Sequence, residues 1–206
     1  IDDLNKNHFH KGLNFKVIDK IKFYKHNFIN EIFKNKIDLI VIAVNSNGID
    51  WIAEELKKIS KDNQLPKLLM LTKGLSLNNK KYELLVNKLE RLLLKKGIKN
   101  INISAIGGPC LAPGLAKRFH SAVVVANKNA DTAKHLSKML SNDYYHVSSS
   151  TDINGVEVCA AIKNIYSMVI GAAQGINKIE SEGNFYLNTA AALIKQSVYE
   201  MEIFSE

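Results

Sequence analysis

The chain has 206 residues, of which 46% are hydrophobic and 23% are charged, a composition that predicts a folded globular protein and excludes a disordered one. Its net charge of +8 comes from lysines spread along the chain with no basic block interleaved by aromatic residues, which favours attraction of small anionic ligands over specific nucleic-acid binding. Neither a run of eighteen uncharged apolar residues nor an apolar opening run is present, so no membrane span or signal peptide is expected.

The first part of the chain alternates short runs of β-branched residues or leucine with amphipathic segments. The expected strands are 38–44, 67–72, 101–106, 122–126 and, at a sheet edge, 144–148. The expected helices are 48–60, 79–96 and 130–140. Strands that alternate with helices predict an α/β fold whose sheet is parallel in its first part.

The pattern changes after Ser150, where helical spacing over 155–176 and 187–204 follows with no strand between. We therefore expect an α/β domain over residues 1–150 and an all-helical domain over residues 151–206. Two helices are too few to enclose a core, and the first residue is Ile1 rather than Met. Both observations lead us to expect a fragment that lacks both ends.

Three strand ends carry turns that suit ligand binding: 45–47 (Asn-Ser-Asn), Lys73-Gly74, and 107–110 (Gly-Gly-Pro-Cys). Ligands of open α/β sheets bind at the carboxyl ends of the strands, where these turns would lie side by side. Paired glycines let the backbone approach a ligand closely, and a short helix from Leu111 would favour an anion. Each signal alone is also typical of an ordinary surface turn.

The predicted helix 155–176 has a narrow polar stripe of Lys163, Ser167 and Gln174, flanked by Asn164. A second, apolar face is formed by Val158, Ile162, Ile165, Val169 and Ile176. This pattern predicts a helix packed on two sides with its polar stripe lining a cavity. A lysine facing a cavity can donate a proton or polarise a carbonyl. The alternative is a surface lysine whose stem covers apolar neighbours.

Two cysteines, Cys110 and Cys159, stand far apart without the spacing of metal ligands. That pattern argues against a disulfide framework and indicates a reducing, cytoplasmic compartment. The six histidines form no metal-ligand set either, so no metal site is expected.

Four segments resemble NAD(P)-dependent glycerol-3-phosphate dehydrogenases. The most specific is STDINGVEVCAAIKNIYSMVIGAAQGI at 150–176, with its Gly-Val-Glu and Ile-Lys-Asn motifs. The others are TKGL at 72–75, GGPCLAPGLAKRFHSAVVVAN at 107–127 and NTAAALIKQSVYEM at 188–201. The resemblance runs, with gaps, from about residue 38 to residue 201.

This resemblance implies a Rossmann-like domain and hydride exchange between NAD(P)H and dihydroxyacetone phosphate, giving sn-glycerol 3-phosphate for glycerophospholipid synthesis. It implies NAD or NADP as cofactor, a small-molecule substrate, and a homodimer as one possible assembly. Site residues carried over from the family have distinct roles. Lys163 would be the general acid and base; Lys73, Gly108, Cys110 and Asn164 would bind substrate; Lys73, Ala112 and Asn45 would bind the cofactor.

The chain also departs from the family pattern. Cys110 stands where Ser, Thr or Asn is common, Pro113-Gly114 replaces a charged pair, and Ala190 replaces an Arg or Lys. The Gly-rich GxGxxG turn and the later Arg-Asn pair of the family are absent, which again predicts a fragment. The alternatives are a related β-hydroxyacid dehydrogenase and, in another class, a non-catalytic or nucleic-acid-binding basic protein.

Overall fold

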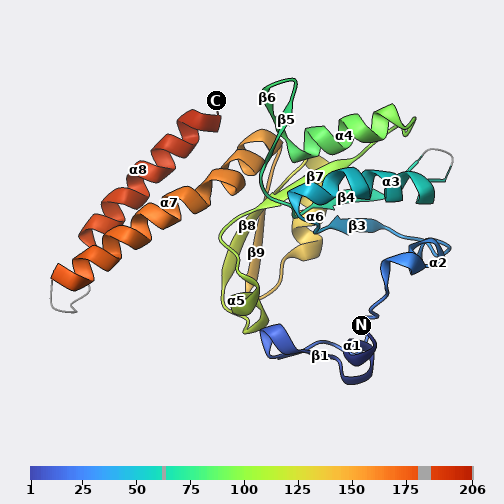
Figure 1. Cartoon of the computed structure of the whole chain (residues 1–206), viewed down its shortest axis with the longest axis horizontal. Helices are drawn as coiled ribbons and strands as arrows, with labels where there is room; N and C mark the ends of the chain where they lie inside the picture. Colours follow the sequence, from blue (N-terminus) through green and yellow to red (C-terminus); the bar gives the residue numbers. More distant parts are fainter. Residues whose placement is uncertain (62–63, 181–186, 206) are drawn as a thin grey trace.

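A computed structural model describes residues 1–61, 64–180 and 187–205 and shows a five-stranded sheet with helices on both faces (Figure 1). The spatial order of the strands is β3-β4-β7-β8-β9. Their bounds are Leu39–Ile42 (β3), Lys67–Met70 (β4), Ile103–Gly107 (β7), Ser121–Ala126 (β8) and Tyr145–Ser150 (β9). All five strands predicted from the sequence are confirmed, with β9 at the predicted edge.

The sheet is parallel only in its first part, as predicted. β3, β4 and β7 run in the same direction, whereas β8 pairs with β7 in the antiparallel sense and β9 pairs with β8 in parallel. The last two strands therefore run opposite to the first three, which decides where the chain goes after β9.

Strand β4 shows how the two faces of the sheet are filled. Leu68 and Met70 pack in one cluster with the apolar faces of α3 (Ile49–Ile59) and α4 (Leu85–Lys95). Leu69, between them, points to the other face and packs under α6 (Ala130–Leu140). Because successive side chains of a strand alternate between faces, a continuous apolar run is what a sheet covered on both sides requires. We call the second set, Leu69, Val123, Val125, Leu136 and Val147, the α6 cluster.

The predicted helix 79–96 is wrong in its first part. Residues Leu75–Asn78 and Lys81–Leu84 form a small antiparallel hairpin, β5 and β6, and α4 begins only at Leu85. The two residues between these strands, Asn79 and Lys80, have φ values of 49° and 64°. Two successive left-handed residues are typical of the two-residue hairpin turn, which interrupts the helix. The helical spacing of Leu84 and Leu85 concealed this turn.

The first 38 residues form short elements at one end of the molecule (Figure 1). They are α1 (Asp2–Asn7), β1 (Phe9–His10), η1 (Lys11–Leu13), β2 (Phe15–Lys16), η2 (His26–Phe28) and α2 (Ile29–Ile32). Asn5 closes this segment, since its side chain donates to the carbonyl of Phe23 at 2.7 Å and accepts from the N–H of Phe23 at 2.9 Å.

Two long helices follow the sheet and extend away from it, side by side (Figure 1). They are α7 (Ile153–Glu180) and α8 (Asn188–Ser205). The predicted burial of one apolar face of α7 is wrong within the described chain: Ile165, Val169 and Ile176 are 59%, 50% and 55% exposed. The reason is that α8 packs along a different side of α7. The predicted domain division at residues 150–152 stays a prediction, although β9 ends at Ser150, just before α7 begins.

Among the described residues, the stretch Ile153–Ile179 of α7 is the one helix with the length and apolar composition that a membrane crossing needs. A single such helix is weak evidence for a membrane span, because core helices of soluble proteins share these properties. Glu157 and Lys163 interrupt its apolar residues. The sequence-based expectation of no membrane span therefore stays a prediction.

The hairpin turn gives a first testable prediction. Lys80 has a left-handed backbone, which costs a residue with a Cβ about 1 kcal/mol and costs glycine almost nothing. Lys80→Gly should raise the free energy of unfolding by about 0.5–1 kcal/mol, measured by urea denaturation. Lys81→Gly, on strand β6, is the matched control and should lower it by a similar amount. Equal destabilisation by both substitutions would contradict the turn.

Candidate functional site

The direction of β9 brings α7 to the edge of the sheet that carries the strand-end turns. Ser150, the last residue of β9, pairs with Ala126 of β8, which pairs with Ala105 in the middle of β7. The chain therefore leaves the sheet level with the middle of β7. Helix α7 then runs past Gly107, the last residue of β7, towards the carboxyl end of that strand.

The contact between α7 and β7 leaves little room for a side chain at Gly107. A Cβ there would lie 3.1 Å from Val156 and 3.3 Å from the Cβ of Ala160, both on α7. At Gly108, where φ is +150°, a Cβ would lie 2.8 Å from backbone atoms of β8. The structure therefore uses both glycines for close packing of a helix and a strand, and the sequence interpretation that they also admit a ligand stays a prediction.

A cavity of about 870 Å³ opens where this turn, the end of β9, α7 and α8 meet. Among the described residues that line it, Lys163 is the one cationic side chain, and it is half-buried. Three successive serine residues at the end of β9 and the Gly-Gly-Pro turn form the wall on the sheet side. The main lining residues are Gly107, Gly108, Pro109, Ser148, Ser149, Ser150, Lys163, Tyr166, Ser197 and Met201. The rest of the lining is largely apolar and includes one acidic residue, Asp152, so the cavity suits a ligand that combines apolar surface with a few polar or charged groups.

The cavity brings together two of the predicted site residues, Gly108 and Lys163, and not the others. Asn164 follows Lys163 on α7 but is exposed. Cys110 is half-buried and packs against the α6 cluster, away from the cavity lining. Ala112, the first residue of the short helix α5 (Ala112–Ala116), is exposed. The roles of these residues stay predictions.

The turns after β3 and β4 lie side by side, as predicted. The hydroxyl of Thr72 donates to the carbonyl of Val44 at 2.7 Å, which ties the two strand ends together. Beyond it, Gly74 has a φ of +125°, and a Cβ there would lie 3.9 Å from Ser46 with nothing nearer. Lys73, between these anchors, is exposed. This edge therefore offers an open surface and an exposed positive charge, that of Lys73.

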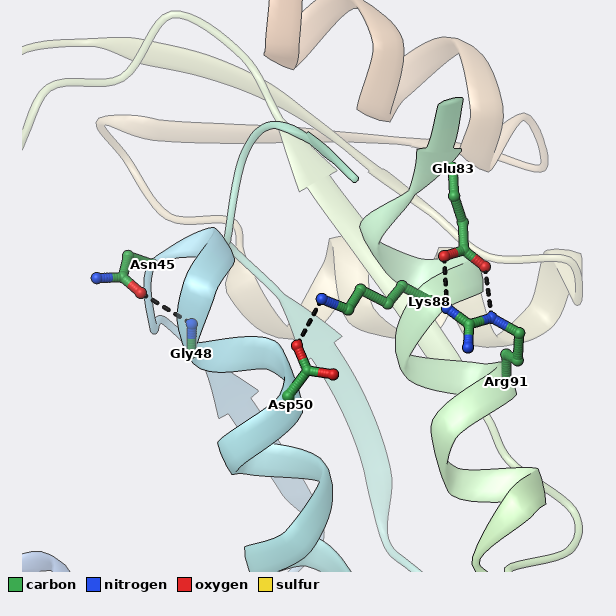
Figure 2. Close-up of polar contacts among 6 residues, drawn as sticks. All are labelled: Asn45, Gly48, Asp50, Glu83, Lys88 and Arg91. Carbon is green, nitrogen blue, oxygen red and sulfur yellow. Dashed lines mark hydrogen bonds and ion pairs between the residues drawn. The ribbon is translucent and has the colours of Figure 1, made fainter. Parts of the chain in front are cut away.

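Polar contacts fix the predicted cofactor residue Asn45 and its neighbours (Figure 2). The side-chain oxygen of Asn45 accepts from the N–H of Gly48 at 2.9 Å and so caps η3 (Ser46–Gly48), which leads into α3. Its amide nitrogen points away from the helix (Figure 2). Lys88 of α4 forms an ion pair with Asp50 of α3 at 2.6 Å, joining the two helices beside this turn.

Glu83 and Arg91 hold the hairpin against α4 beside the same turn (Figure 2). Two hydrogen bonds of 2.7 Å run from the guanidinium of Arg91 to the two carboxylate oxygens of Glu83. The Arg91 guanidinium holds the pKa of the Glu83 carboxyl below its usual range. A bidentate pair has a defined orientation, so it fixes the position of β6 relative to the first turns of α4.

Sequence reasoning missed a buried carboxyl group, Glu157 on α7. It is 6% exposed, and the N–H of Val86 donates to its two carboxylate oxygens at 3.3 and 3.2 Å. Burial raises the pKa of Glu157 to about 7, although hydrogen bonds from the backbone of Val86 and Leu85 act in the opposite direction. The signal that could have indicated it is an acidic residue within an otherwise small and apolar helical stretch.

Two further side chains near the start of α7 are explained by the structure. The carboxylate of Asp152 accepts from the N–H of Gly155 at 2.8 Å and so caps the helix that carries Lys163. Cys159 lines the cavity, and burial raises the pKa of its thiol, as does the nearby Asp152 carboxylate. A thiol kept protonated is a poor nucleophile, which argues against cysteine catalysis here. The described residues contain no cluster of His, Cys, Asp or Glu that could hold a metal ion.

Comparison with known families assigns the chain. The family model for the N-terminus of NAD-dependent glycerol-3-phosphate dehydrogenase matches residues 1–133, and the model for the C-terminus of the same enzyme matches residues 152–206. The chain therefore belongs to the NAD-dependent glycerol-3-phosphate dehydrogenase family, as its motifs indicated.

Two bacterial relatives show the same relationship. A glycerol-3-phosphate dehydrogenase (NAD(P)⁺) of Fusobacterium nucleatum is 31% identical over 173 residues, which cover 84% of this chain and 47% of the relative. That of Leptospira biflexa is 30% identical over 171 residues, covering 83% of this chain and 47% of the relative. The chain thus spans about half the length of the curated relatives it matches.

Solved structures share the fold. A glycerol-3-phosphate dehydrogenase structure from Dunaliella salina matches with a TM-score of 0.77 at 20% identity, covering 100% of this chain and 33% of that one. A second, from Coxiella burnetii, matches with a TM-score of 0.74 at 22% identity, covering 98% of this chain and 56% of that one. The predicted fold class, a Rossmann-like sheet domain followed by helices, is confirmed.

Glu157 makes the stability of the fold depend on pH. Its pKa is about 7 in the folded chain against an ordinary value of 4.5, so between these values the folded chain keeps a proton that the unfolded chain has released. Its contribution to stability is therefore fully present below the lower value and is lost as the pH rises through the higher one. At about 1.4 kcal/mol per pKa unit, the loss is roughly 3 kcal/mol.

Glu157→Gln removes this titration while keeping an oxygen that can accept from Val86. We expect the variant to be about as stable as the wild type near pH 5 and more stable than the wild type near pH 8, in urea denaturation across that range. Parallel stability curves for the two proteins would contradict the assigned pKa.

Proposed function

We propose that this chain forms part of an oxidoreductase that transfers a hydride between NAD(P)H and dihydroxyacetone phosphate, giving sn-glycerol 3-phosphate. Membership of the family supports this function. The observation that carries it is the placement of Lys163, half-buried on α7, in a cavity shared with the Gly107–Pro109 turn at the carboxyl end of β7. Sites of open α/β sheets lie at this end of the strands.

Lys163 would supply the proton of the reaction. As the substrate ketone is reduced, negative charge develops on its oxygen, and an ammonium group beside that oxygen stabilises the transition state most. The ammonium then donates a proton to the oxygen to give the secondary alcohol, and in the reverse direction the neutral amine accepts it. A bound nicotinamide supplies the hydride in this chemistry.

The strand-end turns fit the cofactor side of such a site. Between the tied turns of β3 and β4 the surface next to Gly74 is open, and Lys73 there offers a positive charge for phosphate groups. We propose that Lys73 and Asn45 contact the cofactor, with Ala112 beyond the Gly-Pro turn. Either NAD or NADP is expected.

The substrate side has the chemistry for a phosphorylated triose. Serine residues line the cavity on the β9 side, and a serine hydroxyl can hydrogen-bond hydroxyl and phosphate oxygens, while Lys163 supplies positive charge. The net charge of +8 adds a general attraction for anions. We propose that Gly108, Asn164 and Cys110 complete this side and that Lys73 contacts the substrate as well. Neither a metal nor a specific nucleic-acid partner is part of the proposal.

The wider setting is also a proposal. We propose that residues 1–150 are the dinucleotide-binding part and residues 151–206 the helical substrate part of a cytoplasmic enzyme that serves glycerophospholipid synthesis. Buried Glu157, bonded to the backbone of α4, supports placing α7 in the protein rather than in a membrane. Exposed apolar residues along α7 and α8, such as Met168, Ile179 and Tyr199, are compatible with a homodimer.

The principal test is Lys163→Met in the full-length protein, which keeps most of the side-chain stem and removes the proton donor. Turnover with dihydroxyacetone phosphate should fall roughly a hundred- to ten-thousand-fold, as for loss of a general acid, with cofactor affinity nearly unchanged. Steady-state kinetics and calorimetric titration with NADH and NADPH measure the two effects. A surface lysine without a catalytic role predicts unchanged turnover instead.

Lys163→Arg is the matched control, because it keeps the charge but holds its proton too tightly to release it, so it should rescue only part of the lost turnover. A parallel assay with 3-hydroxyacids tests the alternative activity, that of a β-hydroxyacid dehydrogenase. Turnover of those acids without turnover of dihydroxyacetone phosphate would assign the chain to the related hydroxyacid chemistry.

Lys73 generates a different expectation. As an exposed point charge at a strand end, it should favour phosphate-bearing ligands without transferring a proton. Lys73→Ala should weaken cofactor or substrate binding, raising KM, while kcat changes little. A fall in kcat by orders of magnitude at unchanged binding would show that Lys73 takes part in the chemical step.

A further inference from the structure

Glu157 lies close to the candidate site without lining it. It precedes Lys163 by slightly less than two helical turns, on the side of α7 that faces the sheet domain. Its side chain is buried, with 6% exposed. It is not among the residues that line the cavity. The described residues offer it no ion-pair partner, so its role must come from its hydrogen bonds.

Those hydrogen bonds end on the first turn of α4, a helix that lacks a cap of its own. The N-cap residue of α4, Leu84, makes no side-chain hydrogen bond to the helix, and the first turn holds no acidic residue. The first N–H groups of a helix have no partner within it and carry partial positive charge. Both carboxylate oxygens of Glu157 accept from one of them, the N–H of Val86, and the backbone of Leu85 also favours the carboxylate, so Glu157 caps α4 from another helix.

The neighbours of Glu157 on α7 set the geometry of the site. Val156, the preceding residue, and Ala160 are the two that lie against Gly107 at the end of β7. From Glu157, the helix rises about 9 Å to Lys163, at about 1.5 Å per residue. A small tilt about the Glu157 contact therefore displaces the ammonium group relative to the Gly107–Pro109 turn.

We propose that Glu157 is a positioning residue, which docks α7 on the N-terminus of α4 and thereby places Lys163 against the Gly107–Pro109 turn. Its part in catalysis rests on the function proposed above. The docking itself does not, because it depends only on the contacts of Glu157 with Leu85 and Val86. A protonated carboxyl and an amide both keep a carbonyl oxygen that can accept these N–H groups.

Two substitutions in the full-length protein test the inference. Glu157→Ala removes the acceptor and should lower kcat about a hundredfold with KM nearly unchanged, the effect of displacing a catalytic group by about 1 Å. Glu157→Gln keeps an acceptor and should stay within about threefold of the wild type. Leu136→Ala, in the α6 cluster, is a matched destabilising control that leaves the contact intact, and its kcat should stay near the wild-type value.

Hydrogen exchange gives a readout that needs no substrate. The amides of Leu85 and Val86 and of the first turns of α7 should exchange at least tenfold faster in Glu157→Ala than in Leu136→Ala of equal stability, and Glu157→Gln should protect them. Equal exchange in the two variants, or an equal fall in kcat in both, overturns the inference. If the wild type does not reduce dihydroxyacetone phosphate, the proposed function fails, and the exchange experiment alone decides the docking.

Discussion

The close approach of α7 to the end of β7 is the constraint on which the site depends. A helix lies this near a strand most easily where the strand has no side chain, and Gly107 provides that position beneath Val156 and Ala160. Because β8 and β9 run opposite to β7, α7 starts level with the middle of β7 and reaches this point at the carboxyl end of that strand. Sheet topology, one glycine and one helix together place Lys163 beside the Gly-Pro turn, and the remaining contacts keep it there.

The fold could be predicted largely from local sequence patterns. Continuous β-branched or leucine runs identified strands such as β3 and β4, because a strand covered on both faces of the sheet needs apolar residues at successive positions, whereas the edge strand β9 has a mixed sequence. The hairpin before α4 was missed because Asn79 and Lys80 adopt left-handed backbone conformations without the glycine that usually marks such a turn. The exposure of Ile165 was missed because an apolar stripe says that a face can be buried, not which element covers it.

The site was only partly predictable, and mainly through family resemblance. Helical periodicity placed Lys163 on a polar stripe, and strand ends indicated the Gly108 turn; the structure brings both to one cavity. It turns Cys110 towards the α6 cluster and leaves Asn164 exposed, which spacing along the chain could not reveal. The role of Glu157 was not predicted because its partners are backbone amides of a helix distant in the sequence. Almost every residue has a backbone amide, so a sequence pattern does not show which of them a carboxylate will bind.

The hydrogen bonds between Glu157 and Val86 join residues 71 positions apart in the chain. Closing so long a loop costs more conformational entropy than forming the β3–α3–β4 unit or the hairpin and helix that precede β7. Contacts of large sequence separation also slow folding. We therefore expect the sheet with α3 and α4 to form first and α7 to dock late, so that a half-folded chain already has its strand-end turns but has not yet brought Lys163 beside them.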